Sequence, residues 1–197
     1  MQRASQSQDD PEPPDDPEPQ DDPEPQDDLW LSERQLYDWV ALMGLVMTLP
    51  ASLDAQLKQD AGLNLFEYHI LVELAAVPGR VRVMSELAAY TRGSLSRLSH
   101  AVSRLEAAGW VQRRSCGGAG RRTEAQLTDA GWQKLQQTAP GHVREARRLV
   151  IDTLTVDQLR ELGTAARLIV SAADPQVAAT LLASEPLIRN GDEHEQA

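Results

Sequence analysis

The 197-residue sequence has few features that would stabilise a fold by means other than ordinary packing. Its single cysteine, Cys116, cannot form an intrachain disulfide, which excludes a disulfide scaffold and a cysteine-rich zinc module and is typical of a reducing compartment. Aromatic residues make up 4% of the chain although 41% is hydrophobic, so a core must be built mainly from Leu, Val and Ala. The longest apolar run, residues 39–46 or slightly more, is shorter than the roughly 20 residues that span a membrane. The acidic, proline-rich N-terminus is not a secretory signal, so we expect a cytoplasmic protein with no membrane partner and one domain or two small ones.

The formal net charge of −11 conceals an uneven distribution. Residues 1–28 hold eleven acidic residues and one arginine, a net charge of −10. Residues 80–122 hold nine arginines against Glu86 and Glu106, a net charge of +7. A compact basic segment in an otherwise acidic chain is typical of a protein that binds a polyanion.

The acidic segment is repetitive: residues 9–28 read DDPEPP, DDPEPQ, DDPEPQ, DD and contain seven of the twelve prolines. No apolar residue lies between Ala4 and Leu29, so we expect the segment to be disordered and extended. Two roles remain open for it. It is either a solubilising tail or an anionic mimic that competes with nucleic acid for the basic segment.

The folded part begins with a strongly apolar helix. Ser32 and Gln35 have capping-box spacing, which predicts a helix start at Ser32. The helix body is apolar nearly all round, so it must be covered on several sides, and a second copy of the chain is the simplest cover. Pro50 predicts a kink or an end, followed by a second stretch over residues 51–60.

The remaining elements are mostly helices around one hairpin. Asn64 and Glu67 form another capping pair, and Thr155 and Gln158 a third. The predicted elements are a helix from residue 64 to Pro78-Gly79, a short helix at 85–90, a turn at 91–93, a helix at 94–108, strands at 110–114 and 122–127, a helix at 129–139 interrupted at Pro140-Gly141 and resumed to about 154, and a helix from 155 to about 172. This order predicts a mainly α (α+β) fold with a winged helix-turn-helix in its middle.

The domain organisation follows from the same order. We predict a disordered acidic tail (1–28), an apolar N-terminal helix region (29–60), a winged helix-turn-helix domain (61–128), C-terminal helices (129–174), and a partly helical or frayed C-terminal tail (175–197).

The helix at residues 94–108 has two contrasting faces. Leu98, Val102 and Leu105 form an apolar stripe, with Leu95 beside it on a helical wheel. The opposite face carries hydroxyls, an imidazole and two guanidinium groups, but no acid and no lysine. This composition suits the DNA major groove, because small side chains allow close approach and arginine pairs bidentately with guanine. The candidate DNA contacts are Ser94, Ser96, Arg97, His100 and Arg104. The alternative is a solvated face on which Ser94 only caps the helix.

The hairpin offers a second candidate contact. Arg113 and Arg114 leave its first strand, Arg121 and Arg122 enter its second, and glycines form the tip between them. Of these, we assign Arg113, Arg121 and Arg122 to DNA, because an arginine at such a tip can enter a narrow minor groove. The alternative is a solvated charged loop.

The order of elements over residues 31–175 resembles the MarR family of bacterial transcriptional regulators. The most specific stretch is MSELAAYTRGSLSRLSHAVSRLEAAGWVQRR, residues 84–114. The family's wing reads Asp-x-Arg before a strand ending in Leu-Thr, and GAGRRTEAQLTDAG places Arg121 on the wing arginine and Leu127-Thr128 on the ending. Ala119 stands where the family has an aspartate that usually braces the wing arginine.

The resemblance implies an obligate homodimer that binds an inverted-repeat operator in duplex DNA. It assigns residues 29–60 as the N-terminal dimerisation helix region, residues 129–174 as the C-terminal dimerisation helices, and residues 61–128 as the winged helix-turn-helix DNA-binding domain. It further implies a repressor that a small phenolic or lipophilic anion releases, with a pocket near the first helix. Plausible lining residues are Trp39, Met43, Met47, Tyr68 and His69, but the same Trp/Met stripe also fits a plain dimer core, so no pocket residue is assigned. Cys116 is either a thiol sensor, activated by nearby arginines, or an inert surface thiol.

Other functional classes fit less well. Residues 117–121 are glycine-rich like a phosphate loop, but no Gly-Lys-Ser/Thr follows. The four histidines have no metal-ligand spacing, so we predict no metal site. His100 has no matched acid and nucleophile nearby in the sequence, so we predict no enzyme and no cofactor. The sequence thus predicts a dimeric, sequence-specific DNA-binding regulator. The alternative is a winged-helix protein–protein interaction module with no specific DNA target.

Overall fold

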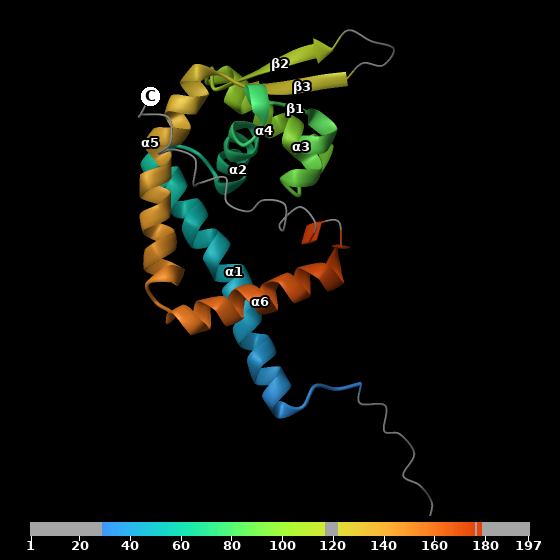
Figure 1. Cartoon of the computed structure of the whole chain (residues 1–197), viewed down its shortest axis with the longest axis vertical. Helices are drawn as coiled ribbons and strands as arrows, with labels where there is room; N and C mark the ends of the chain where they lie inside the picture. The colour runs from blue at the N-terminus through green and yellow to red at the C-terminus, as the bar shows by residue number, and fades with distance from the viewer. Residues whose placement is uncertain (1–28, 117–121, 176, 179–197) are drawn as a thin grey trace, which may run out of the picture. The chain divides into compact units, whose positions relative to one another are not determined.

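The computed structural model describes residues 29–116, 122–175 and 177–178 (Figure 1). The chain divides into two compact units, Met1–Ala41 and Leu42–Ala197, which are described separately. Predictions for the acidic tail, the hairpin tip and the chain beyond residue 178 fall outside the described residues.

The described part of the first unit is the beginning of helix α1 (Glu33–Ala61). The backbone N–H of Ser32 donates to Gln35 Oε1 at 2.8 Å, and the N–H of Gln35 donates to Ser32 Oγ at 3.3 Å. This confirms the predicted capping box. The large apolar side chains here, Leu36, Tyr37, Trp39 and Val40, are exposed in the single chain.

Helix α1 continues through Pro50 to Ala61, so the prediction of a separate second stretch after the proline was wrong. A proline removes one backbone donor from the helix, which is a local cost. Leu57 and Ala61 beyond it are buried in the core of the second unit, and this packing offsets the cost.

The centre of the second unit is a three-helix and three-strand assembly. It comprises α2 (Leu65–Ala75), a 3-10 turn (Pro78–Arg80), β1 (Val81–Val83), α3 (Met84–Tyr90), α4 (Leu95–Ala107), β2 (Val111–Cys116) and β3 (Arg122–Leu127). The antiparallel sheet has the order β1-β3-β2, and β2 and β3 run out from the helices as a ribbon (Figure 1). The predicted hairpin is confirmed. The third strand was not predicted, because three residues are too few to show an alternating pattern.

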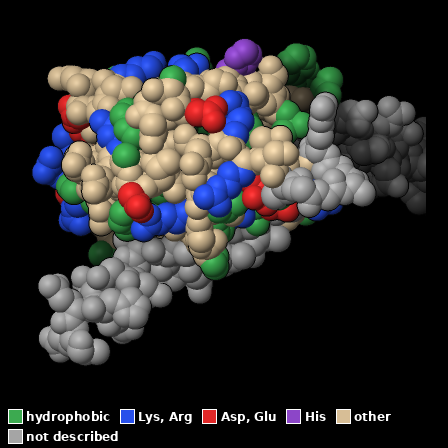
Figure 2. All heavy atoms as spheres, turned by 90° about the horizontal axis from the view of Figure 1, so that it is seen from above, with side chains coloured by type: hydrophobic (Ala, Val, Ile, Leu, Met, Phe, Trp, Pro, Cys, Tyr) green, Lys and Arg blue, Asp and Glu red, His purple; other side chains and the backbone are tan. Residues whose placement is uncertain are grey.

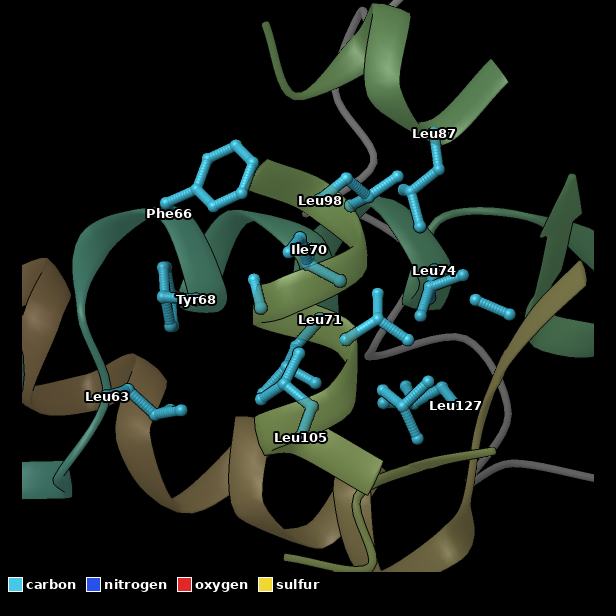
Figure 3. Close-up of a cluster of buried hydrophobic side chains, with 14 of the residues drawn as sticks. Leu63, Phe66, Tyr68, Ile70, Leu71, Leu74, Leu87, Leu98, Leu105 and Leu127 are labelled. Carbon is cyan, nitrogen blue, oxygen red and sulfur yellow. The ribbon is translucent and has the colours of Figure 1, made fainter. Parts of the chain in front are cut away.

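The core of this assembly surrounds α4 (Figure 3). Leu98 and Leu105 of α4 are buried against α2, where Ile70, Leu71 and Leu74 are fully buried. Other core members come from α3 and β3, so the packing fixes α4 between α2, α3 and the sheet. As the sequence predicted, this core consists mainly of Leu, Ala and Val.

The C-terminal helices are α5 (Asp129–Ala146), which widens into a π-helical segment (Arg147–Ile151), and α6 (Val156–Ala173). The predicted interruption at Pro140-Gly141 was wrong, because α5 runs through both residues. The irregular segment lies one to two turns later. The Thr155–Gln158 capping box of α6 is confirmed, and no residue of α6 is buried in the single chain.

By length and composition alone, α1 could cross a membrane, which the short uninterrupted apolar run in the sequence had not indicated. The exclusion of a membrane span on run length was therefore too strict. A helix that packs against another protein chain passes the same test.

Candidate nucleic-acid interface

Helix α4 begins at a well-formed cap. Ser94 has extended backbone angles, and its hydroxyl accepts a hydrogen bond from the backbone N–H of Arg97 at 3.2 Å. The chain leaves the helix at Gly109, whose φ of 76° lies in the left-handed region that glycine tolerates best. Both ends lie where the sequence placed them, within a residue.

The two faces of α4 separate as predicted. Leu98, Ala101, Val102 and Leu105 are buried. Leu95, which the wheel places beside this stripe, is 58% exposed. The predicted contacts on the polar face of α4 are all exposed: Ser94, Ser96, Arg97, His100 and Arg104.

Arg97 rests on an aromatic ring. Its Cζ atom lies 4.2 Å from the centroid of Phe66, which is itself almost buried at the start of α2. A guanidinium over a ring face is held by a cation–π attraction while its edge stays open to partners. The stack therefore restricts Arg97 without occupying its hydrogen-bond donors.

Arg104 is tied to α2. Its Nε donates to Oε1 of Glu67 at 2.5 Å, and the Glu67 side chain is buried while that of Arg104 is exposed. Glu67 also closes the capping box with Asn64 at the start of α2. The sequence indicated the cap but gave no sign of the pair with Arg104, because the two residues are 37 positions apart.

Arg113 on β2 braces the base of the hairpin against α4. Its guanidinium donates to Glu106 Oε2 at 2.7 Å, to the Ser99 carbonyl at 2.7 Å and to Ser103 Oγ at 3.0 Å. Arg122 at the start of β3 is exposed. Arg121, Ala119 and the side chain of Cys116 lie outside the described residues.

Other arginines of the basic segment are engaged within the fold. Arg82 lies 3.9 Å from the centroid of the Tyr90 ring and pairs with Glu73. Two more pairs, Arg80 with Asp129 and Arg92 with Asp174, also join the segment to acids outside it. The local positive field is therefore weaker than the count over residues 80–122 suggests. Figure 2, viewed from the sheet end of Figure 1, shows Lys and Arg side chains spread over this face with fewer acidic ones between them.

An open cleft of about 1240 Å³ borders the polar face of α4. Arg97, His100 and Arg104 form part of its wall, and α1, α2 and the turn before α4 supply the rest. The pKa of Asp54 is lowered because the Lys58 ammonium and the backbone N–H of Leu65 donate to it. The lining residues are Pro50, Ala51, Asp54, Lys58, Asn64, Leu65, Phe66, His69, Thr91, Arg92, Arg97, His100, Ser103 and Arg104.

Of the candidate pocket residues in the second unit, His69 lines this cleft, whereas Met43, Met47 and Tyr68 do not. The surrounding protein partly removes water from the His69 ring and so lowers its pKa, although the residue is exposed at the open cleft. Sequence reasoning missed His142 of α5. Its ring lies 4.5 Å from that of Tyr68, and its pKa is lowered by burial and by the charge of His69.

Comparison with known proteins gives a consistent result. Residues 61–122 match a family model described as MarR family. Sco3205, a MarR family transcriptional regulator from Streptomyces coelicolor solved in complex with DNA, is 42% identical with a TM-score of 0.71, covering 74% of this chain and 95% of its own. AbsC, a MarR family regulator from the same organism, is 35% identical with a TM-score of 0.68, covering 73% of this chain and 97% of its own.

A more distant likeness is BldR, a transcriptional regulator from Sulfolobus solfataricus, 20% identical with a TM-score of 0.61, covering 72% of this chain and 99% of its own; it shows the fold alone. A comparison with curated protein sequences found no match. On its identity to Sco3205 and AbsC over nearly their full lengths, the chain belongs to the MarR family of winged-helix, DNA-binding transcriptional regulators.

Proposed function

We propose that this protein is a homodimeric, sequence-specific regulator that represses transcription and releases its operator when a small molecule binds. The observation that carries the proposal is the polar face of α4, which is exposed while the opposite face is buried in the core. A helix fixed in this way by its core can enter a major groove as a rigid unit.

The proposed DNA surface combines this face with the hairpin. Arg97 and His100 point donors at base edges, and the hydroxyls of Ser94 and Ser96 bond phosphates or bases. Arg113 supports the hairpin from its base, and Arg121 and Arg122 contact the minor groove. The full set is Ser94, Ser96, Arg97, His100, Arg104, Arg113, Arg121 and Arg122.

The exposed apolar side chains of α1 and the C-terminal helices support a dimer. They form too large a set for a monomer in water, and a second copy is the cover we propose. Residues 29–60 and 129–174 are then the dimerisation arms, and residues 61–128 the DNA-binding domain. The exposed side chains are Leu36, Trp39, Val40, Leu45, Val46 and Met47 of α1, Val143 and Ile151 near the end of α5, and Val156, Leu168 and Ile169 of α6.

The cleft supports the proposed release step. Its wall includes Arg97, His100 and Arg104, so a small molecule bound there contacts side chains of the DNA surface. Lys58 and Arg92 also border the cleft, where Asp54 and Asp174 pair with them, while Leu65 and Phe66 add apolar surface. These groups suit a lipophilic anion, which would compete with DNA for the same arginines.

Selection of genomic fragments with the purified full-length protein tests the proposal. We expect enriched sites with two inverted half-sites about one helical turn apart, as a two-fold symmetric dimer requires. Binding to them should weaken steeply between about 50 and 200 mM salt, because the protein releases counterions in proportion to the phosphates it contacts. No retained fragment, or a flat salt dependence, would favour the protein-interaction module instead.

The hairpin has its own test. Arg121→Ala should weaken operator binding, most strongly at AT-rich flanks where the minor groove is narrow. A footprint identical to that of the unmodified protein would remove the hairpin from the proposed surface.

A further inference from the structure

Glu67 is a buried carboxylate that uses both oxygens on different partners. Its Oε2 accepts the backbone N–H of Asn64 at 3.0 Å, which closes the capping box of α2. Its Oε1 accepts Nε of Arg104 at 2.5 Å. The Glu67 side chain is 8% exposed, and that of Arg104 is 59% exposed. One residue of α2 thus holds an exposed arginine of the polar face of α4.

The start of α2 is itself anchored to α1. The backbone N–H of Leu65 donates to Asp54 Oδ1 at 2.8 Å, and Lys58 Nζ lies 2.7 Å from the other oxygen of Asp54. The first turn of α2, which carries Glu67, is therefore held in place by α1. Its carboxylate can define the position of a longer and more flexible partner.

Only the inner side of the Arg104 guanidinium is used. Its Nε is bound to Glu67, and its two terminal nitrogens make no hydrogen bond to any residue that the structure describes. A guanidinium is planar, so fixing Nε also fixes the directions of the terminal N–H groups. These groups remain available to a ligand on the exposed side of α4.

We propose that Glu67 is a positioning residue for DNA recognition, which orients Arg104 so that its terminal nitrogens meet a DNA phosphate. The inference rests on the proposed role of α4 in DNA binding. An exposed arginine loses conformational freedom when it binds, and a side chain already held in one orientation loses less. The aligned fork also suits the oxygens of a phosphate.

The charge of Glu67 makes the proposal sharply testable. A carboxylate close to DNA repels phosphate, so removing the charge alone should strengthen binding to any duplex. Loss of positioning of Arg104 should instead weaken binding to the operator. Glu67→Gln separates the two, because glutamine keeps the length of the side chain and can still close a capping box.

The experiment measures Kd for a selected operator and for a random duplex of equal length over a salt series. For Glu67→Gln we expect operator affinity to fall about 5- to 20-fold, the range of a weak to moderate coupling, while random-duplex affinity stays equal or rises. Arg104→Ala should lower the slope of log K against log salt by about one, as loss of one phosphate contact requires. The double variant should match Arg104→Ala alone, because the effect of Glu67 passes through Arg104.

Glu73→Gln is the matched control. Glu73 lies on the same helix and pairs with Arg82, which is not part of α4. Its removal should leave the ratio of operator to random affinity unchanged. Glu67→Asp is the second variant, because it keeps the charge but shortens the reach to Arg104, and it should lower the same ratio. Urea midpoints and helical content of each variant identify any loss of folding.

Three results would overturn the proposal: operator affinity of Glu67→Gln that is unchanged or rises in parallel with random affinity, an unchanged salt slope for Arg104→Ala, or additive effects in the double variant. Arg97→Ala separates this failure from a failure of the proposed function. If Arg97→Ala also leaves operator binding intact, α4 is not the recognition helix. If Arg97→Ala loses binding and Glu67→Gln does not, only the positioning role fails.

Discussion

The guanidinium of Arg97 lies on the ring of Phe66, and the neighbouring turn fits closely around that ring. A Cβ atom on Gly93 of this turn would lie 2.5 Å from the Cζ atom of Phe66. Phe66 also lines the cleft beside α4. Phe66 therefore packs against the turn before α4, lines the cleft and supports Arg97, a proposed contact to DNA bases.

Arg97→Ala and His100→Ala should each weaken operator binding by roughly 1–3 kcal/mol and relax the sequence preference at one position per half-site, because each removes a contact to a base edge. Selection of randomised operators by the variant proteins measures the change in preference. Arg114, an exposed hairpin arginine outside the proposed set, offers the matched Arg→Ala control. Equal losses on specific and random DNA would contradict base contacts by these residues.

Glycine substitutions should rank in a defined order. A Cβ atom on Gly131 would lie 2.1 Å from the backbone oxygen of Trp110, whereas one on Gly93 meets only the end of the Phe66 side chain. A ring can shift more easily than the backbone that joins α4 to β2. We expect Gly93→Ala to destabilise the fold by about 1–3 kcal/mol, as overpacking typically does, and Gly131→Ala by more. Urea denaturation measures both, and the reverse order would contradict the packing described above.

Stability should fall as the pH is lowered through the histidine range. Partial removal of water from the ring lowers the pKa of both His69 and His142 in the folded protein, and the charge of His69 lowers that of His142 further. The unfolded chain then binds protons at a higher pH than the folded one, so stability is lost as the pH falls below the unfolded value of about 6.5. His142→Gln should reduce the difference in urea midpoint between pH 7.5 and pH 5.5.

His100→Gln is the control for that experiment, because His100 is exposed on the polar face of α4. It changes the number of histidines without altering the contact between His142 and Tyr68. A loss of pH dependence of equal size in both variants would show that the half-buried His142 ring is not responsible.

Deleting residues 1–28 distinguishes the two roles left open for the acidic tail. If the tail competes with DNA, its removal should tighten binding at low salt and have little effect at high salt, where the attraction between charges is screened. Replacing its acidic residues by Asn and Gln tests charge at constant length. Unchanged affinity at low salt assigns the tail a solubilising role.

Local features were predictable because they depend on neighbours in the sequence. The three capping boxes need only residues three positions apart, and the buried stripe of α4 follows from helical periodicity. The predicted helix breaks at the two prolines were wrong because they too rested on local sequence alone. A local rule places a break at Pro50 and Pro140, but packing of residues such as Leu57 keeps α1 continuous.

The candidate site was only partly predictable. Its exposed residues on α4 could be named, because the wheel separates them from the apolar stripe. The partner of Arg104 could not be named, since Glu67 lies 37 residues away and its place in the sequence is already explained by its role in the capping box of α2. Likewise, nothing near His142 in the sequence points to Tyr68.

By itself the sequence determined the order of the elements except β1 and the continuity of α1 and α5, together with the family and the side of α4 that faces solvent, because helix caps, turns and hydrophobic spacing act over a few residues. Which arginines remain available to a ligand was decided only by the tertiary structure. Arg82 and Arg113 meet carboxylates or carbonyls brought to them by packing, whereas Arg104 is bound only at Nε and keeps its terminal nitrogens for a ligand. A charge count over a segment cannot include such partners, since an ion pair depends on distance in space and not on separation along the chain.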